Sequence, residues 1–499
     1  MKSGAASNRD GASDGDLRRE LRHRSTRGGA VTVSAQGLRF ILQLLATAAM
    51  LRLLTPDEVG VFAQFVVIAT FANIFHEAGL GAATVQAREI DQRQVSTLFW
   101  LNGGLGLLAA AVAAGLGPLV ALAFDEPRLI GVAIACAPMF FVGAMAGQHQ
   151  AMLQRRMRFL PLAIADTGGM ALGAACGIHA AAIGLGYWAP VVLAAATAVS
   201  RTSILWILSG WSPSRPAPLS EVRPMLGFGA GLTGASVFNM VRVIAPNAVL
   251  ATMASSAVVG LFDRAYHLLV LPLERLLPPI RLVAVPMLAR LQDDGPALVR
   301  AHARLLRIAL HATLPVSVLC FCGADEIVAI MAGVQWSEAV PLFRALAPLA
   351  VTQVIASLCV WVLTATGKSR ALLVFSALNA GLAVLSVIIG ASFGALGVAL
   401  AFSLGAVLVR TPMLVAMTVR NTPLPLSSML RSAAAPLLIA LALAVGLYSL
   451  RPVLLGQGWH DAVVLMVFGV SIALVWLVFQ GRAMLAEARW LLSNYRRRA

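Results

Sequence analysis

Apolar stretches long enough to cross a lipid bilayer follow one another along almost the whole chain. A helix needs about 20 mainly apolar residues to cross the hydrocarbon core of a bilayer. Stretches of that length fall at 31–54, 60–83, 94–123, 129–151, 160–183, 187–208, 225–252, 258–288, 304–322, 339–366, 370–391, 394–418, 430–450 and 461–481. Stretches this long indicate helices, which satisfy their own backbone hydrogen bonds within lipid. The sequence therefore predicts an all-α polytopic membrane protein with about 14 transmembrane helices.

The composition agrees with this fold class. Charged residues make up 12% of the chain and hydrophobic residues 59%, whereas a soluble domain carries about twice that share of charge. A formal net charge of +16 is also found in nucleic-acid-binding proteins. Here, however, the basic residues fall in short turns between apolar stretches, where membrane proteins place them on the cytoplasmic side. We therefore predict membrane lipids, and no nucleic acid, as partners.

The charge of the turns alternates along the chain. Basic turns, such as the one at Arg155 and Arg156, are followed by acidic or uncharged turns, such as the one at Asp57 and Glu58. Three arginines depart from this trend because they lie at outer ends: Arg52, Arg128 and Arg451. The rule that basic loops stay inside then predicts a multi-pass membrane protein with both termini cytoplasmic.

The chain repeats itself after six stretches. Val-Gly-Val-Phe at 59–62 is echoed by Val-Gly-Leu-Phe at 259–262, and Arg-Thr at 201–202 by Arg-Thr at 410–411. Each half holds an even number of stretches, so both halves enter the membrane the same way round and form parallel repeats. We predict the following division: a disordered basic cytoplasmic arm (1–30), an N-lobe (31–209), a stiff cytoplasmic linker (210–224), a C-lobe (225–420), two additional helices (421–481) and a basic cytoplasmic tail (482–499).

The stretch at 258–288 is apolar yet carries Asp263, Arg264, His267, Glu274 and Arg275. A charge at the centre of a membrane helix costs about 3 kcal/mol, so such residues face a protein interior or a water-filled path, or pair with one another. Arg264 and Arg275 are three helical turns apart and share a face. The segment is therefore interpreted as the cationic wall of a transport path.

The same stretch contains three prolines, at 272, 278 and 279. Proline has no backbone N–H and clashes with the preceding turn of a helix. We therefore expect this helix to be interrupted there, with neighbouring helices or water satisfying the freed carbonyl groups.

Several motifs recur in an order typical of one family. The chain reads Leu-Arg-Leu-Leu-Thr-Pro-Asp-Glu-Val-Gly at 51–60, Glu-Ala-Gly-Leu-Gly-Ala-Ala-Thr-Val-Gln at 77–86, Leu-Phe-Trp-Leu-Asn at 98–102, Leu-Gln-Arg-Arg at 153–156 and Gly-Leu-Phe-Asp-Arg-Ala-Tyr at 260–266. In this order and spacing they resemble the polysaccharide transporter (Wzx-like) family of lipid-linked oligosaccharide flippases. This family belongs to the multidrug/oligosaccharidyl-lipid/polysaccharide superfamily. The resemblance covers roughly residues 30 to 420.

The resemblance implies two six-helix lobes that rock around a central cavity between inward-open and outward-open states. It also implies export of an undecaprenyl-diphosphate-linked oligosaccharide, such as an exopolysaccharide, capsule or O-antigen repeat unit, across the bacterial inner (cytoplasmic) membrane. Polysaccharide polymerase and chain-length proteins are the partners it suggests. The chain departs from the family at Phe262, where members commonly have tyrosine, and at 245–248, which lacks the acid that members often carry there.

Intramembrane charges supply the candidate site. In a fold of this kind the first, seventh and eighth spans flank the interface between the lobes, and guanidinium groups match phosphate oxygens. The candidate substrate-binding cations are Arg39, Arg242, Arg264 and Arg275. The candidate acids for H⁺ or Na⁺ coupling, or for pairing with arginine, are Glu77, Asp166, Asp263 and Glu274.

Two interpretations of these arginines remain open from the sequence. Arg264 either attracts the lipid diphosphate or forms an internal ion pair with Glu77 or Asp166. Arg201 and Arg410 lie near the cytoplasmic ends of their stretches, where long side chains reach towards the interface. We therefore expect these two arginines to extend away from the bilayer centre.

Catalysis is not predicted. The outer turns are too short for a catalytic domain, and no nucleotide-binding or triad motif occurs. The five cysteines lie within apolar stretches without metal-ligand spacing, so we predict packing roles and no cofactor beyond a coupling ion. The alternative function is a cation-coupled multidrug exporter of the same superfamily. A more distant one is a membrane glycosyltransferase or glycan ligase.

Overall fold

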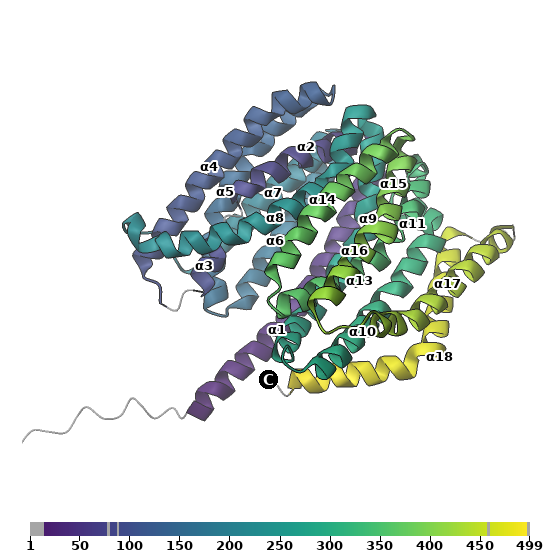
Figure 1. Ribbon diagram of the computed structural model, residues 1–499. Helices are drawn as coiled ribbons and strands as arrows, with labels where there is room; N and C mark the ends of the chain where they lie inside the picture. Colours follow the sequence, from purple (N-terminus) through teal and green to yellow (C-terminus); the bar gives the residue numbers. More distant parts are fainter. Residues whose placement is uncertain (1–13, 77–79, 87–88, 457–459, 497–499) are drawn as a thin grey trace, which may run out of the picture.

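The computed structural model describes residues 14–76, 80–86, 89–456 and 460–496 (Figure 1). At some helical positions, including 14–33, 224–239 and 271–275, it describes the backbone and not the side chain. The elements of the described chain are helices joined by short turns. This arrangement confirms the all-α fold class.

The helices follow the predicted stretches closely. The N-lobe comprises α1 (Asp14–Leu53), α2 (Pro56–His76), α3 (Leu80–Gln86), α4 (Gln92–Ala123), α5 (Arg128–Arg155), α6 (Phe159–Ala182) and α7 (Trp188–Ser209). The C-lobe comprises α8 (Leu219–Met253), α9 (Ser256–Arg290), α10 (Gly295–Cys322), α11 (Ala324–Met331), η1 (Val334–Trp336), α12 (Ala339–Leu346), α13 (Leu349–Ala365), α14 (Ser369–Ala391), α15 (Gly394–Gly405), η2 (Ala406–Arg410) and α16 (Thr411–Asn421). Two further helices, α17 (Leu426–Gly456) and α18 (Asp461–Arg496), follow.

Helices able to cross a membrane are abundant. Over the described residues, 11 helical segments are long and apolar enough to span a bilayer, and each overlaps a predicted stretch. The other three predicted spans coincide with α2, α8 and α9, which do not meet this criterion over their described residues. The polytopic fold is thus confirmed, while the count of 14 stays a prediction.

The packing of the helices repeats between the lobes. In the N-lobe α1 packs along α6 and α6 along α7, and in the C-lobe α8 packs along α14 and α14 along α15. The two lobes meet where α2 packs against α9. The additional helices α17 and α18 pack against α10 and so extend the C-lobe side of the molecule (Figure 1).

Two local expectations differ from the structure. Helix α1 begins at Asp14, so residues 14–30 of the predicted disordered arm are helical. The interruption predicted at the prolines of α9 is wrong, because the helix is continuous from Ser256 to Arg290. Each proline removes one backbone hydrogen bond, but α2, α10, α12 and α13 all pack against α9 and hold it in place.

The linker between the lobes is fixed to the N-lobe. The backbone N–H of Ser214 donates to Ser96 Oγ (2.9 Å), and that of Ala217 donates to Thr97 Oγ1 (2.7 Å). Both acceptors lie in the first turns of α4. Residues 210–218 therefore follow the N-lobe surface before α8 begins.

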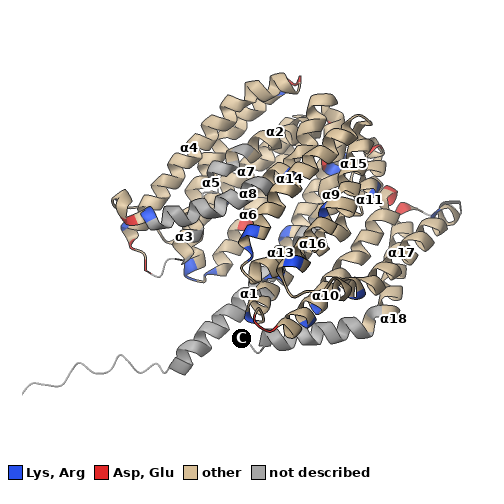
Figure 2. Cartoon of the chain, viewed as in Figure 1, with Lys and Arg blue, Asp and Glu red and all other residues tan. Residues whose placement is uncertain are grey.

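Charged residues are sparse along the helices, which appear mostly uncharged in Figure 2. We call the end of the bundle that carries the turns after α1, α4, α8 and α10 the outer end. It is the end that the charge pattern predicts to face the periplasm.

This orientation predicts a labelling pattern. In a variant without native cysteines, Val334→Cys, which is 84% exposed at the outer end, should react with a membrane-impermeant thiol reagent applied to intact cells. Lys368→Cys, exposed in a basic turn, and Arg497→Cys in the tail should react only after permeabilisation. Mass-tagging on gels reads out each position. Reaction of the 497 cysteine in intact cells would refute cytoplasmic termini.

Candidate functional site

The two lobes touch most closely at a pair of glycines. A Cβ atom on Gly60 of α2 would lie 1.7 Å from the carbonyl oxygen of Ser256, and one on Gly260 of α9 would lie 2.1 Å from that of Pro56. Both obstacles are backbone atoms, so no side-chain movement relieves them. The duplicated Val-Gly-X-Phe motifs therefore meet, and only glycine permits this approach of the helices.

Polar side chains join the lobes beside this crossing. Arg128 donates to Asp57 (2.7 Å) and to Glu126 (2.6 Å), and the hydroxyl of Ser256 donates to Glu126 (2.6 Å). The hydrogen bonds from Arg128 lower the pKa of Glu126 below its usual 4.5. A carboxylate with a depressed pKa contributes stability above its unfolded pKa and loses it as the pH falls through the folded value. The contact between Arg128 and Glu126 therefore persists into mildly acidic medium.

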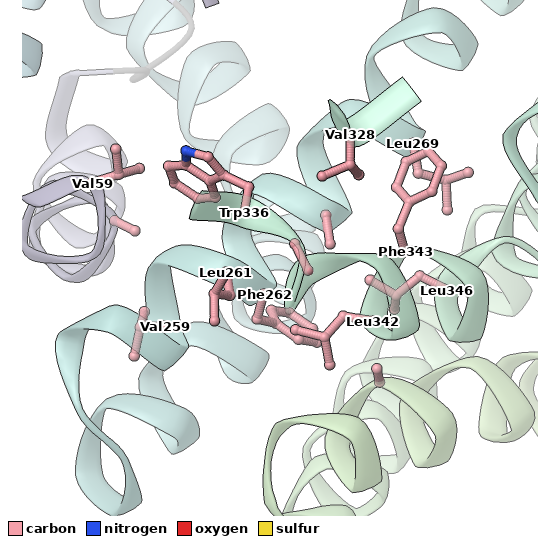
Figure 3. Close-up of a cluster of buried hydrophobic side chains, with 14 of the residues drawn as sticks. Val59, Val259, Leu261, Phe262, Leu269, Val328, Trp336, Leu342, Phe343 and Leu346 are labelled. Carbon is pink, nitrogen blue, oxygen red and sulfur yellow. The ribbon is translucent and has the colours of Figure 1, made fainter. Parts of the chain in front are cut away.

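A third contact ties α1 to the C-lobe. The indole N–H of Trp336 donates to the carbonyl oxygen of Leu51 (2.8 Å), and Arg52 donates to that of Ile330 (2.6 Å). Figure 3 shows Trp336 beside Val59 of α2, within the buried apolar cluster that both lobes share. The outer end is therefore closed in this conformation.

The three outer arginines that break the charge trend all have partners there. Arg52 and Arg128 make the contacts just described, and Arg451 of α17 donates to the buried carboxylate of Glu326 (2.8 Å). Each positive charge on the outer side thus has an acceptor, which removes its conflict with the predicted topology.

A charged cluster lies within the N-lobe. Asp166 of α6 accepts from Arg201 Nε of α7 at 2.7 Å, and a guanidinium nitrogen of Arg39 lies 3.9 Å from the same carboxylate. Arg201 also donates to Gln150 of α5 (2.7 Å). Its carboxylate and amide partners hold Arg201 against α5 and α6, and its extension towards the interface stays a prediction.

A second cluster lies within the C-lobe. Asp263 is only 2% exposed and accepts from its neighbour Arg264 (2.6 Å) and from Asn247 of α8 (2.8 Å). The oxygen that accepts from Asn247, Oδ1, also lies 3.4 Å from His267 Nε2. Arg264 thus forms an internal ion pair, as one interpretation held, but Asp166 is not its partner. That carboxylate is taken by Arg201 in the other lobe.

Arg410 occupies a different environment from the one expected. It is 4% exposed, donates to the carbonyl oxygen of Phe402 (2.5 Å), and its guanidinium carbon lies 4.4 Å from the centre of the Phe402 ring. Arg242 of α8 lies near enough for the two positive charges to repel. Arg410 is therefore buried and does not extend to the interface.

Three predicted site residues fall outside the description. Glu77 is not described, and the side chains of Glu274 and Arg275 are not described within α9. Over the described residues no group of three His, Cys, Asp or Glu could hold a metal ion. The cysteines are buried, except Cys176.

Sequence reasoning missed the neutral partners. Gln150 accepts a hydrogen bond from Arg201, and Asn247 donates one to Asp263. Neither residue carries a charge, so the search for charged residues within apolar stretches did not find them. The repeat did offer a signal for two other residues, because Arg201 and Arg410 occupy matching places in the two halves.

Positive charge prevails among the described charges of these interior clusters. These clusters contain arginines at 39, 201, 242, 264 and 410 and two described carboxylates, those of Asp166 and Asp263. A low-dielectric interior with excess arginine favours an anionic ligand, and guanidinium groups suit phosphate oxygens.

Comparison with known proteins places the chain in a family. Residues 49–341 match the family described as "Polysaccharide biosynthesis protein". The lipopolysaccharide biosynthesis protein WzxC of Escherichia coli (strain K12) is 24% identical, over 74% of this chain and 76% of that protein. The teichuronic acid biosynthesis protein TuaB of Bacillus subtilis (strain 168) is 23% identical, over 66% of this chain and 68% of that protein.

Solved structures share the fold. The lipid II flippase MurJ in an inward closed conformation superposes with a TM-score of 0.72, at 13% identity, over 91% of this chain and 100% of that one. An inward-facing multidrug resistance MATE transporter superposes with a TM-score of 0.60, at 16% identity, over 78% of this chain and 97% of that one. The family match covers more than half of the sequence and confirms the resemblance seen in the motifs. The chain therefore belongs to the polysaccharide biosynthesis family of membrane transport proteins.

Proposed function

We propose that this protein translocates an undecaprenyl-diphosphate-linked oligosaccharide across the bacterial inner membrane by alternating access of its two lobes. The observation that carries the proposal is the excess of arginine over carboxylate among the described charges of the interior clusters of a polysaccharide transporter. A diphosphate diester carries two negative charges, and this interior supplies cations for them in both lobes.

The closed outer end supports the same mechanism. Contacts between the lobes at Gly60 and Gly260, at Glu126 and Ser256, and at Trp336 all lie at that end. An alternating-access transporter needs one conformation with the outer end shut and one in which these contacts separate.

The proposal is tested in proteoliposomes. A fluorescent undecaprenyl-diphosphate disaccharide is placed in both leaflets, and dithionite is added outside to quench the accessible probe. We expect complete quenching with the protein and about half without it, while a fluorescent phospholipid stays half protected in both. Equal protection of the glycan lipid with and without protein would refute the proposal.

The same vesicles distinguish translocation of a glycan lipid from the alternative function, multidrug export. Uptake of a cationic dye under an imposed H⁺ or Na⁺ gradient, without movement of the glycan lipid, would assign the chain to drug export. A gradient that accelerates movement of the glycan lipid would identify the coupling ion.

A further inference from the structure

Arg410 is a buried cation that has no carboxylate partner among the described residues. No carboxylate oxygen of the described chain lies within 4.0 Å of it, and its Nε has no hydrogen-bond partner. Its contacts are the carbonyl oxygen and the ring of Phe402. Burying an unpaired charge is costly, and proteins keep such a residue where function requires it.

The duplication provides an internal comparison. In the N-lobe the matching arginine, Arg201, has Asp166 as its partner. Asp166 lies nine residues after Met157, which has a positive φ, and Ser376 lies nine residues after Gly367, the corresponding positive-φ turn of the C-lobe. The Ser376 hydroxyl donates to a carbonyl oxygen of its own helix. The C-lobe thus keeps the arginine and has a neutral residue where the N-lobe has the acid.

The local backbone directs Arg410 into the lobe. Pro412 follows two residues later and has no N–H to donate to the preceding turn, and residues Ala406–Arg410 form a π-helical turn. π-Helical turns are rare in proteins, and those that occur are often found at functional sites. Arg242 of α8 and Tyr266 of α9, both partly exposed, lie close enough to interact electrostatically with Arg410.

We propose that Arg410 and Arg242 form an anion-binding position of the C-lobe, and that its ligand is the diphosphate of the transported lipid. This inference rests on the proposed function. The anion lies between the two guanidinium groups, relieves their repulsion and supplies the negative charge that Asp166 supplies in the N-lobe. The contacts of Arg410 with the carbonyl oxygen and ring of Phe402 hold its side chain in place.

Purified protein in detergent tests this with farnesyl diphosphate as the probe. We expect Arg410→Met to weaken binding about 10- to 100-fold, since one charge-assisted contact is lost, and Arg410→Lys to weaken it less. Arg431→Met, which removes an exposed arginine of α17, should bind like the wild type. Isothermal titration calorimetry measures each affinity.

Thermal unfolding separates a binding role from a structural one. Arg410→Met removes an unpaired charge and should melt at or above the wild-type temperature. The matched variant Arg201→Met leaves Asp166 without its closest partner and should melt lower. Melting of Arg410→Met well below the wild type would make Arg410 a structural residue and overturn the inference.

The binding results also separate this inference from the proposed function. If the wild type and Arg410→Met bind farnesyl diphosphate with the same affinity, Arg410 is not part of the anion-binding position. That result would not contradict the proposed translocation of a lipid-linked oligosaccharide. A wild-type protein that binds no polyprenyl diphosphate would refute both.

Discussion

Replacing Arg264 by alanine should lower the amount of folded protein, and replacing Asp263 by asparagine in the same chain should restore it. The single change leaves a carboxylate that is 2% exposed without its closest cation, and breaking one partner of a buried pair costs roughly 3–5 kcal/mol. Asn247 and His267 still contact Asp263 but cannot fully replace the guanidinium. Fluorescence-detected size-exclusion chromatography measures the folded protein.

The control for this experiment comes from the other lobe. Arg264→Ala combined with Asp166→Asn should not recover, because Asp166 pairs with Arg201. Export should return with the Asp263→Asn double variant, since removing a whole ion pair leaves the net charge of the interior unchanged. Recovery of protein without recovery of export would instead show that Arg264 itself binds the substrate.

Replacing Gly60 or Gly260 by alanine should prevent the outer end from closing. The added Cβ would lie 1.7 Å or 2.1 Å from a backbone oxygen of the other lobe. Overpacking costs about 1–3 kcal/mol, so the closed state should become about 10- to 100-fold less populated relative to the open one. Export, measured as transbilayer movement of the glycan lipid, should fall sharply while the inserted protein remains.

Accessibility distinguishes an open outer end from misfolding. Ala63→Cys lies in the buried cluster shared by the lobes and should be unreactive towards an impermeant thiol reagent in the wild-type background. It should become reactive with Gly60→Ala. Gly115→Ala provides the matched control, because its Cβ would meet nothing within 4 Å and both export and protection should be unchanged. Normal export by Gly60→Ala would contradict the closed-gate interpretation.

Hydropathy and motif order determined the fold class, the duplication and the family. Lipid requires each spanning segment to be apolar and helical on its own, so this information is local in the sequence. Most helices of the structure accordingly follow the predicted stretches within a few residues, whereas α1, α10 and α18 extend well beyond theirs. The glycines of the repeated Val-Gly-X-Phe motif were also visible, although their mutual contact was not.

Tertiary structure decided which charges meet. Asp263 pairs with its neighbour Arg264, Asp166 with Arg201, and Arg410 is buried with Phe402. Spacing places a residue on a helix face, but the rotation and tilt of that helix depend on how its neighbours pack. A matching arginine in each half could therefore be read from the sequence. Among the described residues, Arg201 has a carboxylate beside it and Arg410 has none. This difference depends on which side chains the neighbouring helices bring within reach.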